Sequence, residues 1–234
     1  MTSGLFITFE GIDGCGKTTQ WRLLTRYLES NGINLLATRE PGGTALGVQI
    51  RKLVLEKTVS THSPAESGAI SSSAIPQLPP TPLAEALLYA ADRAQHVETV
   101  VRPALLAGRV VLCDRYIDST LAYQGIGRQR DLALIQNLVT IATQGLKPAL
   151  TLLFDLPVAE SQVRLHGSAA HRPAGQLDRL DSEPLDFHER VRTGYLSLAA
   201  AEPDRFRVLD ACCDIETLHQ RVVACLPPEL LNRG

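Results

Sequence analysis

The sequence predicts an α/β fold in which one five-stranded parallel sheet is covered by helices on both faces. Segments with strand character alternate with segments of helical periodicity along the chain, as in proteins whose strands are joined by crossover helices. The predicted strands are apolar on both faces, as expected for strands buried between two helix layers. A chain of 234 residues with 44% hydrophobic and 21% charged residues is long enough to bury such a core.

The predicted strands and helices follow one another in regular order. Each strand is a short run of branched or aromatic apolar residues, at 5–9, 33–38, 109–114, 149–155 and 205–210. Helical periodicity predicts helices at 16–30, 44–56, 83–107, 132–145, 157–166, 183–201 and 215–225. Asn31 and Gly32 mark the end of the first helix, and Pro103 predicts a kink or break in the long one.

Charge and cysteine content exclude several classes of protein. A formal net charge of −2 does not favour a general nucleic-acid-binding protein, so we expect no nucleic acid as partner. No apolar run approaches the ~20 residues of a membrane span, and Met1 to Phe9 lacks the basic start of a signal peptide, so we expect no membrane partner. The five cysteines are odd in number and irregularly spaced, which is typical of reduced thiols in a cytoplasmic protein.

Two segments interrupt the alternation of strands and helices. Residues 58–82 contain five prolines, six serines and a single charged residue, a composition that predicts a disordered surface insertion. Residues 167–181 form a second irregular segment, and its arginines predict a role beyond that of a linker. We therefore expect one domain over residues 1–228, followed by a C-terminal tail at 229–234.

Residues 11–18 form the most specific short motif. Gly11, Gly16, Lys17 and Thr18 occupy every fixed position of the pattern G-x-x-x-x-G-K-[ST], between a predicted strand and a predicted helix. Glycines let backbone N–H groups turn towards an anion, and the helix N-terminus adds its dipole. In such a loop the lysine bridges the outer phosphates and the hydroxyl ligates Mg²⁺. The motif predicts a P-loop NTPase fold with an ATP-binding loop made of Gly11, Ile12, Asp13, Gly14, Cys15, Gly16, Lys17 and Thr18.

The carboxylate of Asp114 follows the third predicted strand. An acidic side chain at the carboxyl end of an apolar strand is typical of the Walker B position, which holds Mg²⁺ directly or through water. The alternative role is to cap the segment that follows, because aspartate is common at helix N-termini. Beside a P-loop we expect Asp114 to ligate Mg²⁺ together with Thr18.

Several further motifs occur in an order that resembles one family. They are F-E-G-I-D-G-C-G-K-T-T from Phe9, T-R-E-P-G-G-T from Thr38, Y-A-A-D-R-A-Q-H from Tyr89, D-R-Y from Asp114 with S-T and Y-Q-G soon after, and L-D-R-L from Leu177. Together they resemble the thymidylate kinase (dTMP kinase) family from Phe6 to about Cys225, apart from residues 58–82. The resemblance implies a nucleoside monophosphate kinase fold and a homodimer. It also implies transfer of the γ-phosphoryl group of ATP to dTMP with Mg²⁺, giving ADP and dTDP for dTTP synthesis.

The resemblance also implies which residues bind the acceptor nucleotide. Arg39 and Arg115 match positions that contact its phosphate, and Arg93 matches the position that contacts the base. Tyr89 lies one helical turn before Arg93 and matches an aromatic residue that stacks on thymine. Asp13 matches the carboxylate that binds the 3′-hydroxyl group of the sugar. The wall around base and sugar is expected to comprise Ser119, Thr120, Tyr123 and Gln124.

The catalytic positive charges are expected on the P-loop and in a lid. Residues 167–181 occupy the place of the family's lid over ATP, and Gly14 stands where some members carry a basic residue. The lid region is therefore expected to supply that charge. The candidate catalytic residues are Lys17, Asp114, Arg115, Arg164, Arg172 and Arg179. An insertion at 168–171 leaves open which arginine reaches the transferred phosphoryl group.

Two other functions are compatible with parts of the sequence. Another nucleotide kinase of this fold would share the P-loop and act on a different base, and Tyr89, Arg93 and residues 119–124 distinguish it from a dTMP kinase. A non-catalytic nucleotide-binding switch would bind ATP without phosphorylating an acceptor, and the combination of Lys17 with Asp114 argues against it. The alanine-rich segment 83–107 is the candidate homodimer interface.

Overall fold

The computed structural model, which describes residues 4–56, 78–169 and 178–231, has one sheet at its centre. All neighbouring strands run parallel, in the order β2-β3-β1-β4-β5. The strands are β1 (Phe6–Glu10), β2 (Leu35–Arg39), β3 (Val110–Asp114), β4 (Leu150–Asp155) and β5 (Phe206–Asp210). The predicted five-stranded parallel sheet is therefore confirmed.

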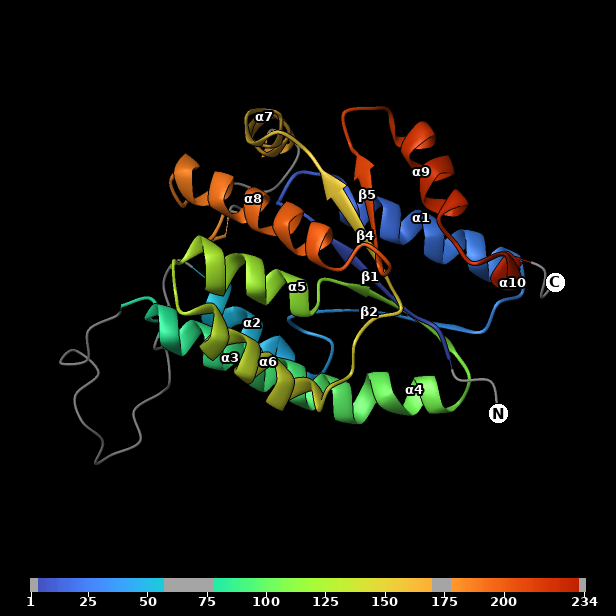
Figure 1. Ribbon diagram of the computed structural model, residues 1–234, viewed down its shortest axis with the longest axis horizontal. Helices are drawn as coiled ribbons and strands as arrows, with labels where there is room; N and C mark the ends of the chain where they lie inside the picture. Colours follow the sequence, from blue (N-terminus) through green and yellow to red (C-terminus); the bar gives the residue numbers. More distant parts are fainter. Residues whose placement is uncertain (1–3, 57–77, 170–177, 232–234) are drawn as a thin grey trace, which may run out of the picture.

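Helices cover both faces of this sheet (Figure 1). One side carries α1 (Lys17–Ser30) and α9 (Ile215–Ala224), and the other carries α3 (Pro82–His96), α6 (Leu132–Thr143) and α8 (Leu185–Ala201). The remaining α-helices of the described residues are α2 (Ala45–Leu55), α4 (Arg102–Leu106), α5 (Ile117–Thr120), α7 (Val158–Ala169) and α10 (Pro228–Leu231). Because both faces are covered, every residue of β1 and β3 is buried, as their continuous apolar runs predict.

The order of the strands determines where a ligand can bind. β1 lies between β3 and β4, while the chain leaves β1 for β2 on the far side of β3. Phe9 of β1 and Arg39 of β2 both pair with Asp114 of β3, so the three strands end together. Open parallel sheets bind ligands beyond the carboxyl ends of the strands where the winding direction changes. The P-loop, Asp114 and Arg39 all lie at this edge.

One helical segment departs from the predicted pattern. After β3 the chain forms α5 and then a π-helical segment at Leu121–Gly127, where the periodicity did not indicate a helix. Gly125 and Gly127 lower the helix propensity of this segment, so its sequence does not indicate a helix. Here Gly127 permits close packing, because a Cβ atom on it would lie 2.7 Å from Val191 and 2.9 Å from Phe187, both of α8. Of the predicted wall residues, Ser119 and Thr120 belong to α5, and Tyr123 and Gln124 belong to the π-helical segment.

The long helix predicted at 83–107 is present but not uniform. α3 runs through a π-helical segment at Val97–Val101 into α4. Pro103 has no N–H group, and its ring clashes with the carbonyl group of residue 99 in a regular α-helix. A π-helical segment in front of the proline therefore accommodates it without ending the helix.

Some predicted segments lie partly outside the described residues. Residues 58–77 of the predicted insertion lie outside them. After it, α3 begins at Pro82, and the hydroxyl of the preceding Thr81 accepts from the N–H of Ala84. The predicted lid begins later than expected, because α7 continues through Ala169 and Gly167 is helical. Residues 170–177 lie outside the described residues. At the C-terminus, Leu230 of α10 is buried against the core.

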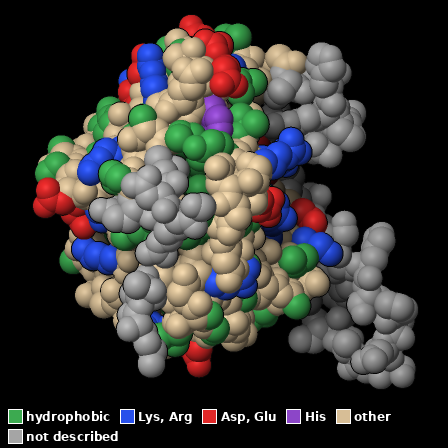
Figure 2. Space-filling view, turned by 90° about the vertical axis from the view of Figure 1, so that its right-hand side faces the viewer, with side chains coloured by type: hydrophobic (Ala, Val, Ile, Leu, Met, Phe, Trp, Pro, Cys, Tyr) green, Lys and Arg blue, Asp and Glu red, His purple; other side chains and the backbone are tan. Residues whose placement is uncertain are grey.

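Charged side chains are mixed on the face of the molecule shown in Figure 2. There, Lys and Arg side chains are interspersed with acidic and apolar ones and form no broad basic area. This distribution agrees with the formal net charge of −2. Among the helices in the described part of the chain, none has the length and apolar character needed to cross a membrane.

Candidate active site

The P-loop connects the end of β1 to the first residue of α1. Gly11, Gly14 and Gly16 have φ angles of 141°, 78° and 92°, a region that glycine enters without strain. A Cβ atom on Gly11 would lie 2.6 Å from the carbonyl oxygen of Phe154, so the turn has no room for a side chain there. No side chain caps the N-terminus of α1. Its first N–H groups therefore remain available to an anion.

Lys17 and Thr18 begin α1 beside two carboxylates. Nζ of Lys17 lies 3.4 Å from Oδ1 of Asp13, with the lysine side chain almost fully buried. The Thr18 hydroxyl donates a hydrogen bond of 2.7 Å to Oδ2 of Asp114. The other oxygen of Asp114, Oδ1, is buried and has no hydrogen-bond partner within the described ranges. A hydroxyl beside a carboxylate with a free oxygen is a hard donor set of the kind Mg²⁺ prefers, so these residues fit a magnesium ion.

The capping role for Asp114 is not what the structure shows. The first helix after β3 is α5, whose N-cap is Tyr116 and has no side-chain capping bond. Asp114 instead points to Thr18 across the sheet edge.

The P-loop lines a cleft of about 1420 Å³. Its floor is formed by residues 13–20, and α7 contributes Arg164 to its wall. Arg164 donates a hydrogen bond of 2.9 Å to the carbonyl oxygen of Ala211, so the loop after β5 holds this arginine in place. Ile215 and Leu218 at the start of α9 also line the cleft. A large cleft with a helix N-terminus at its floor suits a nucleoside triphosphate.

A second cavity of about 510 Å³ adjoins this cleft, because Asp13, Arg51 and Asp178 line both. The predicted acceptor-binding residues that line it are Asp13, Tyr89, Arg93, Arg115, Ser119, Thr120, Tyr123 and Gln124. The structure thus brings together all of the predicted acceptor residues except Arg39. Arg39 is exposed and lines a neighbouring cleft with Thr18 and Asp114. We call the cavity of about 510 Å³ the acceptor cavity.

Arg115 joins the P-loop to the acceptor cavity. Its Nη2 lies 2.6 Å from Oδ1 of Asp13, and its guanidinium group lies over the Tyr123 ring, 5.0 Å from the centroid. The Tyr123 hydroxyl donates to Oδ2 of Asp13 at 2.9 Å. Burial opposes the charge of Asp13, but Arg115 and Lys17 outweigh burial and hold the pKa of this carboxyl well below its usual range. Asp13 is therefore a permanent carboxylate between the two clefts.

Arg93 is buried and held at all three of its nitrogen atoms. Nε donates to Oε2 of Glu40 at 2.8 Å, Nη1 to the Thr120 hydroxyl at 2.8 Å, and Nη2 to the carbonyl oxygen of Tyr116 at 2.9 Å. A guanidinium group carries five N–H donors. Two N–H groups therefore have no partner among the described residues and remain for the acceptor cavity that Arg93 lines.

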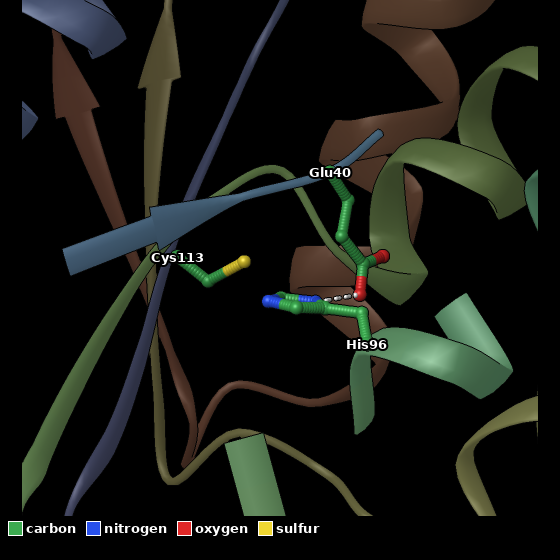
Figure 3. A group of neighbouring side chains, drawn as sticks. All are labelled: Glu40, His96 and Cys113. Carbon is green, nitrogen blue, oxygen red and sulfur yellow. Dashed lines mark hydrogen bonds and ion pairs between the residues drawn. The ribbon is translucent and has the colours of Figure 1, made fainter. Parts of the chain in front are cut away.

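Glu40 supports Arg93 together with His96 (Figure 3). Nδ1 of His96 lies 2.7 Å from Oε1 of Glu40, and Nε2 lies 2.7 Å from the Thr38 hydroxyl. Ligand atoms of Glu40, His96 and Cys113 lie within 4.8 Å of one another, as in a metal site. However, both nitrogens of His96 and both oxygens of Glu40 are already engaged, and burial raises the pKa of the Cys113 thiol well above its usual value. The group therefore holds Arg93 rather than an ion.

Tyr89 serves both the core and the acceptor cavity. It packs against Ile50 and Val54 of α2 in a small apolar cluster, and it lines the acceptor cavity. Arg93 follows one turn later on the same face of α3. The packing fixes the ring at the cavity wall.

Arg51 of α2 is a candidate site residue that the motifs did not indicate. It lines both clefts, and its Nη1 donates to the carbonyl oxygen of Pro41 at 3.1 Å. Burial, followed by the neighbouring charge of Arg39, lowers the pKa of Arg51. A pattern signal exists, because Arg51 follows Gly47 by one turn on the face of α2 that also buries Ile50. That face adjoins the T-R-E-P-G-G-T segment.

A second group missed by the sequence motifs lies behind Ser119. Glu10 accepts hydrogen bonds from the Ser119 hydroxyl at 2.6 Å and from the Tyr195 hydroxyl at 2.9 Å. Burial, reinforced by Asp118, raises the pKa of Glu10 to about 7. Tyr195 belongs to α8, so its place beside Ser119 depends on the fold and has no local sequence signal.

The predicted lid arginines are separated in the structure. Arg164 lines the P-loop cleft, whereas Arg179 does not. The guanidinium group of Arg179 pairs with Glu85 of α3, and its Nε donates to the carbonyl oxygen of Val54 at 3.2 Å. Arg179 is turned towards the helices because Glu85 is a buried carboxylate that requires a cation. Arg172 lies outside the described residues.

Comparison with known proteins identifies the family. A family model described as "Thymidylate kinase" matches residues 9–222. A thymidylate kinase from Clavibacter sepedonicus is 52% identical over 209 residues, covering 89% of this chain and 88% of that protein. A thymidylate kinase from Citrifermentans bemidjiense is 47% identical over 231 residues, covering 99% of this chain and 95% of that protein.

A solved structure gives the same answer for the fold. The crystal structure of thymidylate kinase from Ehrlichia chaffeensis matches with a TM-score of 0.67 and 32% identity, covering 96% of this chain and 99% of that one. On the sequence match, the fold and the site geometry, this chain belongs to the thymidylate kinase family.

Proposed function

We propose that the chain transfers the γ-phosphoryl group of ATP to dTMP, giving ADP and dTDP. The observation that carries this function is the meeting of the P-loop cleft and the acceptor cavity at shared residues. Asp13, Arg51 and Asp178 line both the P-loop cleft and the acceptor cavity. A donor in one and an acceptor in the other would face each other at this junction, as phosphoryl transfer requires.

The donor is assigned to the P-loop cleft. Residues 11–18 are proposed to bind the phosphates of ATP through the N–H groups at the start of α1, and Lys17 to bridge the outer phosphates. Thr18 and Asp114 are proposed to hold Mg²⁺, which neutralises charge on the phosphates when bound. Two observations support this assignment: the 2.7 Å contact between the two side chains, and Oδ1 of Asp114, which has no hydrogen-bond partner in the described part of the chain.

The acceptor is assigned to the acceptor cavity. Tyr89 and Arg93 lie together on one wall and are proposed to hold the base, Tyr89 by stacking and Arg93 through its two free N–H groups. Asp13, Arg115 and Tyr123 form a hydrogen-bonded group at the junction and are proposed to hold the sugar and phosphate. Ser119, Thr120 and Gln124 complete the wall.

The chain's contribution to the transfer is positioning and charge neutralisation. Lys17 and Arg115 are already fixed by Asp13, so they need little rearrangement when the nucleotides bind. Arg51 lies at the junction and Arg164 on the donor side, where positive charge is needed as negative charge moves between the phosphates. Arg39 is proposed to reach the acceptor phosphate from the rim.

A homodimer and a cytoplasmic location are the remaining parts of the proposal. The neighbouring helices α3 and α6 expose large apolar side chains, namely Leu83, Leu87, Leu134 and Ile141. We propose this surface as the interface with a second copy of the chain. All five cysteines are free, as suits a reducing compartment. Light scattering would test the dimer, with Leu87→Glu expected to give a monomer.

The activity is tested by following the product. Purified protein is incubated with Mg²⁺, ATP and dTMP, and nucleotides are separated by anion-exchange chromatography. We expect ADP and dTDP to appear in equal amounts and to be absent without dTMP. ADP without dTDP would contradict the proposal and indicate an ATPase, and nucleotide binding without either product would indicate a non-catalytic switch.

A further inference from the structure

We propose that Glu85 is a positioning residue that fixes the hydrogen-bonding polarity of Gln124 and thereby lets the acceptor cavity select thymine over cytosine. This inference rests on the proposed function, because it concerns how that function's acceptor base is chosen. Glu85 lies in the first turn of α3, is fully buried and does not itself line the cavity. It acts through Gln124, which does line it.

The contact between the two side chains has a defined direction. Nε2 of Gln124 donates to Oε1 of Glu85 at 2.8 Å. An ionised carboxylate has acceptors only, so the amide group that faces it must be the NH₂ end. The other oxygen of Glu85, Oε2, pairs with Arg128 at 3.3 Å and with Arg179. Arginine can only donate, so this carboxyl group accepts from every partner it has among the described residues, and the amide of Gln124 is held in one orientation.

The fixed amide determines what the cavity offers to a ligand. With Nε2 committed to Glu85, the amide atom left to Gln124 is Oε1, an acceptor with no hydrogen-bond partner in the described part of the chain. Arg93 contributes the opposite type of group, because its two free N–H groups are donors. The wall thus presents a donor from α3 and an acceptor from the π-helical segment.

This donor and acceptor complement one pyrimidine and oppose the other. Thymine carries the O4 acceptor next to the N3–H donor, so O4 suits Arg93 and N3–H suits Oε1 of Gln124. Cytosine carries an N4 amino donor next to the N3 acceptor, so both pairings become donor against donor and acceptor against acceptor. A site that leaves buried polar groups unpaired rejects the wrong base strongly. If the amide of Gln124 turned over, its NH₂ group would oppose N3–H and half of this discrimination would be lost.

A double-mutant cycle separates this role from a structural one. The variants are Glu85→Gln, Gln124→Met and the double variant, since glutamine at 85 can donate as well as accept and methionine at 124 removes the polar amide at similar length. The measured quantity is kcat/KM for dTMP divided by kcat/KM for 5-methyl-dCMP, which differs from dTMP only at the N3–C4 edge. Circular dichroism and thermal unfolding verify the fold of each variant.

We expect Glu85→Gln to lower this ratio at least about tenfold, mainly by raising KM for dTMP. In the Gln124→Met background the same change at position 85 should alter the ratio less than about twofold, because the residue it acts through is gone. Equal effects in both backgrounds, or an unchanged ratio in Glu85→Gln, would overturn the inference.

A conservative variant, Glu85→Asp, tests the inference if Glu85→Gln does not fold. Glu85→Asp keeps an acceptor-only carboxylate and should keep a ratio near that of the wild type while raising KM for dTMP. A tenfold loss of the ratio in Glu85→Asp would also overturn the inference. The proposed function is judged separately by the wild-type protein, since absence of dTMP turnover there contradicts the function and leaves no selectivity to measure.

Discussion

The hydroxyl of Thr18 lies 2.7 Å from Oδ2 of Asp114, and this contact joins the first turn of α1 to the end of β3. Two side chains that are 96 residues apart in the sequence therefore form one oxygen donor set beside the P-loop. The other carboxylate oxygen, Oδ1 of Asp114, is buried and has no hydrogen-bond partner among the described residues, so it is the oxygen available to a metal ion.

Removing the Thr18 hydroxyl should weaken Mg²⁺ binding. We expect Thr18→Ala to raise the Mg²⁺ concentration needed for half-maximal activity by about 10–100-fold, because one oxygen ligand and the partner of Asp114 are lost. Thr18→Ser retains the hydroxyl and is the matched control, which should stay within about threefold of the wild type. A Mg²⁺ dependence that is identical in Thr18→Ala and Thr18→Ser would show that the hydroxyl is not a ligand.

Lys17→Ala should separate phosphoryl transfer from acceptor binding. We expect kcat to fall by about 10²–10³-fold, because a preorganised cation beside the reacting phosphates is lost. The Kd for dTMP, measured by calorimetry without ATP, should change less than about threefold, because Asp13 still pairs with Arg115 at 2.6 Å. Turnover at the wild-type rate would contradict the role assigned to Lys17.

Arg93→Ala should damage both acceptor affinity and stability. The variant leaves Glu40 as a buried carboxylate without its arginine, so the free energy of unfolding should fall by about 3–5 kcal/mol. In protein that remains folded, KM for dTMP should rise by about 10–100-fold, since charged hydrogen bonds are each worth about 1.5–3 kcal/mol. Arg207→Ala, at an exposed arginine of the edge strand β5, is the control. An unchanged KM for dTMP would show that Arg93 does not contact the base.

Asp92 should make stability depend on pH. Burial, followed by the charge of Glu40, raises the pKa of Asp92 to about 6 in the folded protein, against an ordinary value of 3.8. Between about pH 4 and pH 6 the folded state binds more protons than the unfolded state, so the free energy of unfolding falls as pH rises. The shift of roughly two pKa units corresponds to a loss of about 3 kcal/mol at most.

Asp92→Asn should remove this pH dependence. Asparagine keeps an oxygen that can accept from the N–H of Gly42, which Asp92 does at 3.0 Å, but it carries no charge. Relative to the wild type, the variant should become more stable as pH rises from 4 to 6, with a constant difference above pH 7. Urea unfolding at a series of pH values measures this difference, and parallel curves would contradict it. Asp186→Asn, at an exposed carboxylate, is the control.

The sequence was sufficient where function is encoded in consecutive residues. The P-loop needs glycines at fixed positions, and Gly11 and Gly16 indeed adopt positive φ angles. The end of an apolar strand located Asp114, because the ends of parallel strands meet at one edge of the sheet. The role of Arg115 came from the family motif. The family motifs placed Tyr89 and Arg93 on one helix face, and both line the acceptor cavity.

The sequence was insufficient where a role depends on partners distant along the chain. Arg179 looked like a lid arginine, but a buried carboxylate 94 residues earlier, Glu85, draws it away from the P-loop cleft. Arg51 and Tyr195 carry no local motif, since their place in the site follows from how α2 and α8 pack. Gly125 and Gly127 lower the helix propensity of residues 121–127, so the sequence did not indicate a helix there. Packing against α8 stabilises the helical segment.

The central claim is that the acceptor cavity binds a thymine nucleotide, and comparing turnover of several nucleoside monophosphates tests it most directly. ADP release is measured in a coupled assay with Mg²⁺ and ATP against dTMP, dUMP, dCMP, UMP and AMP in turn. We expect the highest kcat/KM with dTMP, a lower value with dUMP, and values for dCMP, UMP and AMP that are lower by at least about 10²-fold. Turnover of UMP or AMP equal to that of dTMP would contradict the account.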